Sequence, residues 1–145
     1  MRYRTIAFIL LAGSALAALP DNKQIGEKDD HPRGANSIEH YGGSQIAYDL
    51  DIDFWRLERD WGGPTSIQVQ TGVGLICGCP KGLPFPPWVV VYQKDGTIIG
   101  YALPTSGDFA QIDLPFLAAD EPIWIEVTGF LTDPLDPGWY TVSIY

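Results

Sequence analysis

Apolar and polar residues alternate in short runs from residue 44 to the C-terminus. The runs are rich in Val, Ile, Thr and aromatic residues, and Gly, Pro, Asn or Asp bounds each of them. None of them repeats its apolar residues with the period of a helix. The pattern predicts about eight β-strands, in the segments SQIAYDL, FWRLER, TSIQVQT, WVVVYQK, TIIGYAL, FAQIDL, PIWIEVTG and WYTVSIY.

Turn residues separate these predicted strands. Lys94, Asp95 and Gly96 join two apolar runs, and an Asp-Gly pair supplies the positive φ angles of a type I′ hairpin turn. The segment DPLDPGW predicts the turn before the last strand, and CPKGLPFPP is too rich in proline for a central strand. Short strands with regular turns predict an all-β, antiparallel sandwich or barrel.

Alternation within the last two runs indicates sheets with one buried and one solvent-facing side. Ile123, Ile125 and Val127 share one face of their strand, which leaves Trp124 on the opposite face with Glu126. In WYTVSIY the residues Tyr140, Val142 and Ile144 alternate in the same way with Trp139, Thr141 and Ser143.

Three of the five tryptophans are candidates for ligand binding at the surface. Trp124 and Trp139 lie opposite the apolar residues of their strands, and Trp61 lies in the DWGGP turn. An exposed indole ring forms a flat platform for a sugar ring or an anchor for a protein partner. The alternative for each is packing in the core or at the edge of a sheet.

Aspartates occupy every second position at the start of one predicted strand. Asp49, Asp51 and Asp53 have the same parity as Trp55 and Leu57, which we expect in the core. We therefore expect Asp53 at the rim of the strand, with its carboxylate outside the core. Asp49 and Asp51 are then expected in the approach to the strand.

The N-terminal segment has the order of a secretory signal. Arg2 and Arg4 precede the apolar run IAFILLA, and Ala15 and Ala17 form a small-residue cleavage site. The run is too short for a comfortable transmembrane helix. We therefore expect a secreted protein with no membrane anchor after cleavage. Its parts are a signal peptide at 1–17, an acidic extended leader at 18–43 and a β-sandwich domain at 44–145.

The mature chain is strongly acidic. Without Arg2 and Arg4, seven basic residues face 18 acidic ones, which gives a net charge of about −11. A nucleic-acid partner requires a basic face, which seven scattered cations do not build. Anionic membrane surfaces are disfavoured for the same reason, so we expect the partner to be an extracellular polymer or a secreted protein.

The two cysteines, Cys77 and Cys79, flank a single glycine. An oxidising compartment permits a local disulfide between them, although so small a ring is strained and constrains little chain entropy. Unpaired thiols are the alternative, and a redox pair is a more remote third. No second group of cysteines or histidines supports a zinc site.

Catalytic chemistry finds little support in the sequence. His31 and His40 are the two histidines, and neither lies in a recognised nucleophile or metalloprotease motif. A glycosidase requires two facing carboxylates, and nothing singles out a pair among the available acids. We therefore expect a protein that is not an enzyme; a small hydrolase with a carboxylate pair is the last alternative.

The order of several segments resembles the bacterial pre-peptidase C-terminal domain, over about residues 27–145. The resemblance is carried by DDHPRGANSI, DIDFWRL, VVVYQKDGTIIG, PIWIEVTG and PGWYTVSIY, in that order. The collagen-binding modules of clostridial collagenases are similar in outline. Membership would imply a jelly-roll-like β-sandwich without catalytic activity of its own.

The resemblance also implies a structural calcium site where the leader meets the sandwich. In calcium-binding relatives, leader acids that match Glu27, Asp29 and Asp30 join an acid that matches Asp53. Asp51 is an additional candidate, because clustered carboxylates supply the hard oxygen ligands that calcium prefers. The alternative is that these acids accept backbone N–H bonds in turns, without a metal.

Together these patterns predict a secreted binding module that engages an extracellular polymer or protein through an aromatic sheet face, with calcium bracing the leader. The second interpretation is an accessory or chaperone-like partner of a separately encoded secreted hydrolase.

Overall fold

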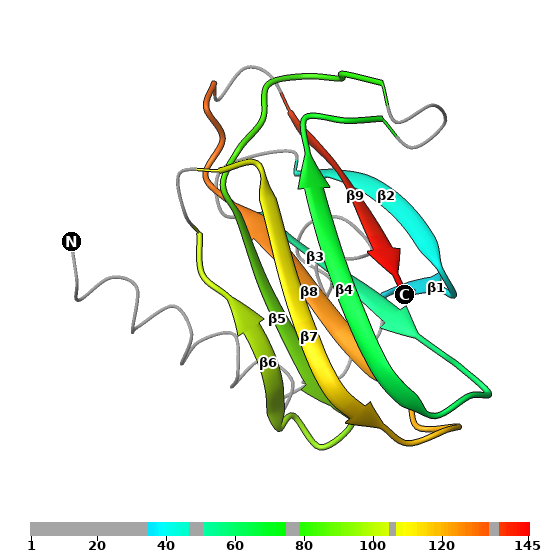
Figure 1. Ribbon diagram of the computed structural model, residues 1–145. Coiled ribbons are helices and arrows are strands. Elements are labelled where there is room, and N and C mark those ends of the chain that lie inside the picture. The colour runs from blue at the N-terminus through cyan, green and yellow to red at the C-terminus, as the bar shows by residue number, and fades with distance from the viewer. Residues whose placement is uncertain (1–34, 47–50, 75–78, 105–106, 134–136) are drawn as a thin grey trace, which may run out of the picture.

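In the computed structural model, the described residues form nine β-strands in two sheets that pack face to face (Figure 1). The structure describes residues 35–46, 51–74, 79–104, 107–133 and 137–145. These residues include no helix, and so none that could span a membrane. The predicted all-β sandwich is confirmed. Its strands are β1 (Asn36–Ile38), β2 (Tyr41–Ile46), β3 (Ile52–Leu57), β4 (Gly63–Thr71), β5 (Pro87–Gln93), β6 (Ile98–Ala102), β7 (Phe109–Leu117), β8 (Ile123–Gly129) and β9 (Gly138–Ile144).

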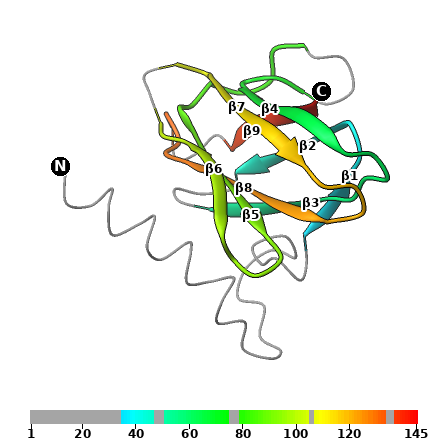
Figure 2. The same ribbon diagram turned by 60° about the horizontal axis from the view of Figure 1, so that its bottom comes forward.

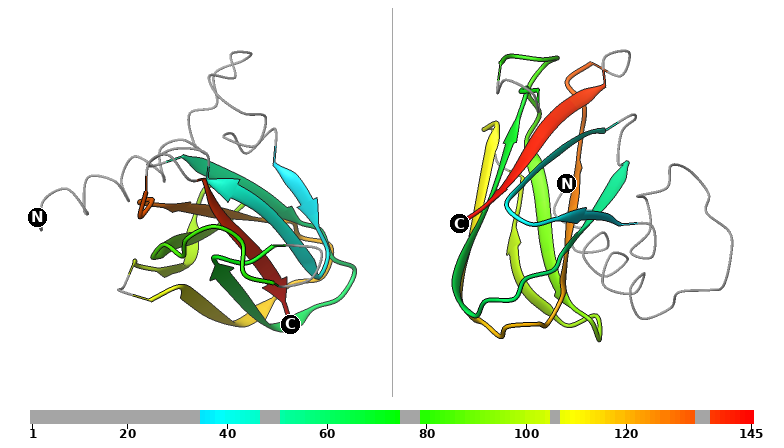
Figure 3. Two further views of the ribbon diagram at one scale, coloured as in Figure 1. Left: turned by 90° about the horizontal axis from the view of Figure 1, so that it is seen from above. Right: turned by 90° about the vertical axis from the view of Figure 1, so that its right-hand side faces the viewer.

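The chain changes sheet at nearly every connection. The five-stranded sheet has the order β1-β3-β8-β5-β6, and the four-stranded sheet has the order β2-β9-β4-β7. All neighbours are antiparallel except β1 and β3, which run parallel. Seen edge-on, the sheets form two layers with the connections gathered at their two ends (Figure 3). The candidate site described below lies at one of these ends.

The sandwich begins at Asn36, within the segment that the sequence analysis assigned to the leader. The strand β1 is three residues long and pairs with β3, and β2 reads YGGSQI, which lacks an apolar alternation. Gly42 of β2 is required by packing, because a Cβ atom there would lie 2.6 Å from the Trp55 ring. The strand β1 is too short to show the alternation by which the other strands are predicted, whereas the predicted segment SQIAYDL overlaps β2 from Ser44 to Ile46.

The core lies between the two sheets and follows the predicted alternation. Ile123, Ile125 and Val127 of β8 face Tyr140 and the alternate apolar residues of β9 within one buried cluster. Trp55 and Leu57 of β3 belong to the same cluster. Burial of these side chains removes apolar surface from water, which is the main favourable term in folding.

The predicted hairpin between β5 and β6 is confirmed, but its turn is of another type. A type I′ turn requires a positive φ at both Asp95 and Gly96. Gly96 has a φ of 85°, but the φ of Asp95 is not positive. Asp95 instead accepts a 2.9 Å hydrogen bond from the Thr97 amide through its side chain. The turn thus has three residues, Lys94 to Gly96, between Gln93 and Thr97, whose backbones are hydrogen-bonded at 2.9 Å, and the aspartate side chain stabilises it.

Candidate functional site

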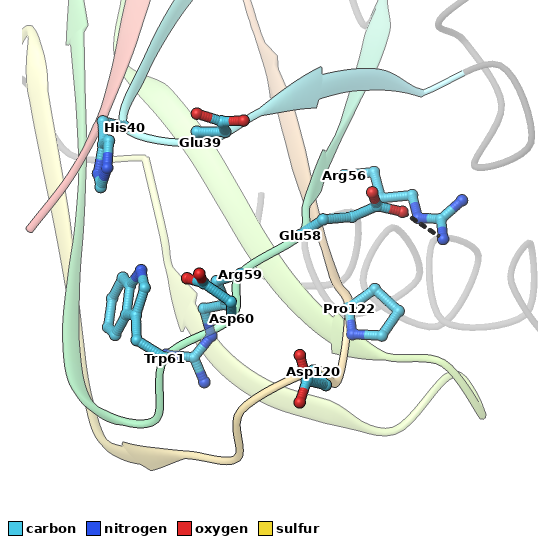
Figure 4. Close-up of a pocket in the computed structure, with 9 residues that line it drawn as sticks. All are labelled: Glu39, His40, Arg56, Glu58, Arg59, Asp60, Trp61, Asp120 and Pro122. Atoms are coloured by element: carbon cyan, nitrogen blue, oxygen red, sulfur yellow. Dashed lines mark ion pairs between the residues drawn. The ribbon is translucent and has the colours of Figure 1, made fainter.

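A pocket of about 570 Å³ lies at the end of the sandwich where three connections meet (Figure 4). The β1–β2 turn, the end of β3 with the β3–β4 connection, and the β7–β8 connection each contribute side chains. The volume is within the range of small-molecule sites. The lining residues are Glu39, His40, Arg56, Glu58, Arg59, Asp60, Trp61, Asp120 and Pro122.

Arg59 holds the walls of this pocket together. Its side chain is 6% exposed, and it donates hydrogen bonds to Thr65 Oγ1 (3.1 Å) and to the Ala118 carbonyl (2.9 Å). The Arg59 carbonyl accepts a further bond of 3.0 Å from the Asp120 amide. Burial lowers the pKa of Arg59 from its usual value, yet an arginine stays charged. The residue therefore ties the β3–β4 connection to the β7–β8 connection.

The ring of Trp61 lies against this buried cation. The Arg59 guanidinium carbon is 4.6 Å from the centroid of the Trp61 ring, within the range of a cation–π contact. Trp61 itself is half-buried, so part of the indole remains accessible in the pocket. The contact holds the indole ring in place before a ligand binds, so that little side-chain entropy of Trp61 is lost on binding.

Arg56 is the second cation of the pocket, and it is more exposed. It forms an ion pair of 2.5 Å with Glu58 (Figure 4). Its guanidinium also lies 5.6 Å from the centroid of the Trp124 ring. The two charged side chains are 44% and 60% exposed, so the pair contributes at most about 1 kcal/mol to stability. Glu39, Asp60, Asp120 and His40 line the remaining walls and add acceptors.

The three tryptophans predicted to bind ligand lie at different places. Trp61 lines the pocket, Trp124 lies on the outer face of the five-stranded sheet, and Trp139 is the second residue of β9, at the opposite end of the sandwich. All three are half-buried. Each also lies against a cation: Trp61 and Trp124 against the arginines described above, and Trp139 against the Lys81 ammonium, which is 3.4 Å from its ring centroid. The structure does not bring them together into one aromatic surface.

The two described acids of the predicted calcium site are buried. Asp51 is 1% and Asp53 0% exposed. Asp53 Oδ2 accepts a hydrogen bond of 2.5 Å from the Tyr140 hydroxyl, which in turn accepts one of 2.9 Å from Trp55 Nε1. The expectation that the Asp53 carboxylate stays outside the core is wrong, because Tyr140 of the facing sheet provides it with a buried partner.

The remaining predicted ligands are not described. Glu27, Asp29 and Asp30 lie outside the described residues, as does Asp49. Asp51 Oδ1 accepts a bond of 3.0 Å from the Ile52 amide, as expected of a strand-initiating aspartate. Within the described part of the chain, no group of three or more His, Cys, Asp or Glu residues could hold a metal ion.

Cys79 is bonded in a disulfide, and Cys77, the other cysteine of the chain, lies outside the described residues. The adjoining loop is anchored by Lys81, whose amide donates to the Gly72 carbonyl at 2.8 Å.

Most of the pocket is not predictable from the pattern of residues along the chain. Glu39, Arg59 and Asp120 come from three separate connections, so no spacing along the chain indicates that they meet. Glu126 was also given no role, although parity placed it on the same face as Trp124. Glu126 is 1% exposed and accepts a hydrogen bond of 2.6 Å from the Tyr92 hydroxyl. Burial raises the pKa of Glu126 to about 7, an effect that its hydrogen bond from Tyr92 partly offsets.

No family model and no curated protein matches the chain. Among solved structures, the chain is similar to the pre-peptidase C-terminal domain of a collagenase from Bacillus anthracis. The two are 16% identical, the TM-score is 0.52, and the match covers 86% of this chain and 100% of that one. The resemblance inferred from the sequence is thus confirmed at the level of the fold.

Two carbohydrate-binding modules are more distant. The first, CBM36 in complex with calcium and xylotriose, is 10% identical with a TM-score of 0.37, and the match covers 72% of this chain and 88% of that one. The second, from Clostridium stercorarium in complex with cellobiose, is 11% identical with a TM-score of 0.34, covering 68% and 70%. Both TM-scores are below 0.5, so these two likenesses add nothing to the first.

Proposed function

We propose that this protein is a secreted, non-catalytic β-sandwich module that binds an extracellular polymer or protein. The observation that carries the proposal is the pocket at the end of the sandwich, where Trp61 lies among carboxylates and two arginines. A fold alone does not determine a function, so the proposal depends on the chemistry of this pocket.

The pocket is suited to a neutral or basic ligand with several polar groups. The part of the Trp61 ring that remains accessible would stack on a sugar ring or an apolar side chain. Carboxylates such as Asp60 and Asp120 would accept hydrogen bonds from hydroxyl, amide or ammonium groups. A polyanion is disfavoured by the net charge of about −11 on the mature chain.

Retention on immobilised polymers tests the proposal. The mature chain is passed over collagen, chitin, cellulose and peptidoglycan, and we expect retention on one of them. Trp61→Ala should weaken that retention at least about tenfold, because aromatic anchors dominate binding energy. Tyr101→Ala is the matched control, since Tyr101 is 61% exposed on β6 and does not line the pocket. Equal retention of both variants would contradict the role of the pocket.

Calcium at the junction between the leader and the sandwich is a second part of the proposal. Asp51 and Asp53 are buried carboxylates at the start of β3, and each has one oxygen in a described hydrogen bond. Glu27, Asp29 and Asp30 would complete a set of hard oxygen ligands. The ion would neutralise mutual repulsion among these acids and so order the leader.

Thermal unfolding with calcium and with a chelator tests the metal. We expect a higher Tm in calcium, because an ion that binds only the folded chain stabilises it. The triple variant with Glu27→Gln, Asp29→Asn and Asp30→Asn should lose this difference. Asp113→Asn on the exposed side of β7 should keep it. A Tm that is the same in calcium and in chelator removes the metal from the proposal.

A further inference from the structure

A second apolar cluster lies on the outer face of the five-stranded sheet, away from the core. Phe54 of β3 and Trp88, Val90 and Tyr92 of β5 form it. Glu126 of the intervening strand β8 lies at its centre, because its pairing partners are Phe54 on one side and Val90 on the other. The three strands β3, β8 and β5 lie side by side in one layer (Figure 2).

These outward-facing side chains are as buried as the core between the sheets. The exposed fractions are 2% for Phe54, 4% for Trp88, 2% for Val90 and 0% for Tyr92. Neighbours within a sheet shield the flanks of a side chain but not its outer end, since strands lie only about 4.8 Å apart. The four-stranded sheet covers the opposite face. A further layer must therefore cover this face.

The cover ends at the edge of the sheet. Tyr101 of β6 pairs with Val90 and lies on the same face, yet it is 61% exposed. Ile98, which pairs with Tyr92, is 37% exposed. The buried part of the face is thus confined to β3, β8 and β5, which follow β1 in the order of the sheet.

The chain itself indicates what forms this layer. Ala35, the first described residue, packs against the cluster, so the described chain begins at the buried face. Each internal stretch outside the described residues has four residues or fewer and joins the ends of two strands. Residues 18–34, by contrast, reach about 56 Å when extended, at about 3.3 Å per residue. The sheet is only about 19 Å wide across its five strands.

We propose that the outer face of β3, β8 and β5 is a docking surface for residues 18–34 of the same chain, which cover Phe54, Trp88, Val90, Tyr92 and Glu126. The leader is then a third layer of the module rather than a linker. This inference does not use the pocket at the end of the sandwich and needs no calcium, although Glu27, Asp29 and Asp30 of the proposed calcium site belong to the same segment.

Photo-crosslinking of the intact mature chain, residues 18–145, tests the proposal. The probe p-benzoylphenylalanine replaces Trp124, which is half-buried at the border of the cluster. We expect intramolecular crosslinks from position 124 to peptides within 18–34. The matched control carries the probe at Phe109 on β7, which is 42% exposed in the other sheet, and should give none of these crosslinks. Crosslinks between two copies, or none to the leader, would overturn the proposal.

Hydroxyl-radical footprinting adds a second readout. A chain with a protease site between Gly34 and Ala35 is folded intact, cut, and passed over a sizing column. If the leader separates, Trp88 and Tyr92 should be modified several times faster, while exposed Tyr101 stays unchanged. Co-elution of the cut leader with the sandwich also supports docking. A leader that separates while Trp88 and Tyr92 stay protected would overturn the proposal.

Discussion

Asp53 and Glu126 are carboxylates buried on opposite faces of the same sheet, and each is hydrogen-bonded to a tyrosine. Asp53 faces the core and accepts a bond from Tyr140 of the other sheet. Glu126 faces outward and accepts a bond from Tyr92 of the neighbouring strand. A buried polar group is tolerated when it has a partner, and loss of that partner exposes the full desolvation cost. Both residues therefore have measurable consequences for stability.

Glu126 should make the protein less stable as the pH rises. The pKa of Glu126 is about 7 in the folded chain and ordinarily 4.5, so the unfolded chain releases this proton first. The contribution of Glu126 to the free energy of unfolding is highest below pH 4.5. It falls by about 3 kcal/mol as the pH rises to about 7. The side chains that face Glu126 from β3 and β5 are Phe54, Val90 and Tyr92.

Glu126→Gln isolates this effect, because glutamine keeps an acceptor for Tyr92 but does not ionise. In urea unfolding, we expect the variant to gain up to about 3 kcal/mol over the natural chain at pH 8 and little at pH 4. Glu121→Gln, at an exposed position in the same region of the chain, is the control. A stability difference that is the same at both pH values would contradict the buried titration.

Tyr140→Phe should destabilise the sandwich by about 2–4 kcal/mol. The substitution removes one hydrogen-bond partner from Asp53 and one from Trp55 Nε1, both within the core. Tyr145→Phe, at a residue that is 68% exposed, should have almost no effect. Urea unfolding of both variants and of a double-mutant cycle with Asp53→Asn measures the coupling. Additive effects in the cycle would mean that the short contact does not stabilise the fold.

At the scale of elements, Phe85 anchors the proline-rich connection between β4 and β5. Its backbone is fixed by Thr71, whose hydroxyl donates to the Phe85 carbonyl at 2.7 Å and accepts from the Phe85 amide at 3.1 Å. Its ring is 1% exposed and lies against Gly129 and Gly138, at the end of β8 and the start of β9. A loop that the sequence presents only as a strand breaker is thus part of the core.

Gly129→Ala should destabilise the fold by about 1–3 kcal/mol, because the new Cβ atom would overlap the Phe85 ring. Phe85→Leu on its own should also destabilise it, through lost packing. In the double variant, the smaller side chain leaves room for the methyl group, so the two losses should not add. Thermal or urea unfolding of the three variants provides the test, and fully additive losses would show that the ring does not contact this glycine.

At the scale of the whole molecule, the sandwich uses its layers and its ends differently. The space between the sheets holds the core, the outer face of the five-stranded sheet is buried over β3, β8 and β5, and one end carries the polar pocket. Arg59 connects the two sheets at this end. It follows β3 of the five-stranded sheet, and its side chain bonds to Thr65 of β4 and to the carbonyl of Ala118 after β7, both in or next to the four-stranded sheet. The pocket is therefore built on the junction of the two layers rather than on a free loop.

The sequence by itself determined the all-β class, the inward residues of β8 and β9, and the position of the β5–β6 hairpin. These features depend on the side-chain alternation and turn residues of a few consecutive positions, and such local preferences act wherever the segment lies. The short strand β1 escaped prediction because three residues carry no period, and its pairing with β3 is what makes it a strand.

Only the tertiary structure decided where the acids and tryptophans lie. Asp53 is buried because Tyr140, 87 residues away, provides its partner, and Trp61 belongs to a pocket because Glu39 and Asp120 come from other connections. The burial of Glu126 and the shift of its pKa likewise depend on its surroundings in space, in which Phe54 and Val90 shield only its two flanks. Desolvation and pairing are properties of what surrounds a group in space, and the order of residues along the chain does not contain them.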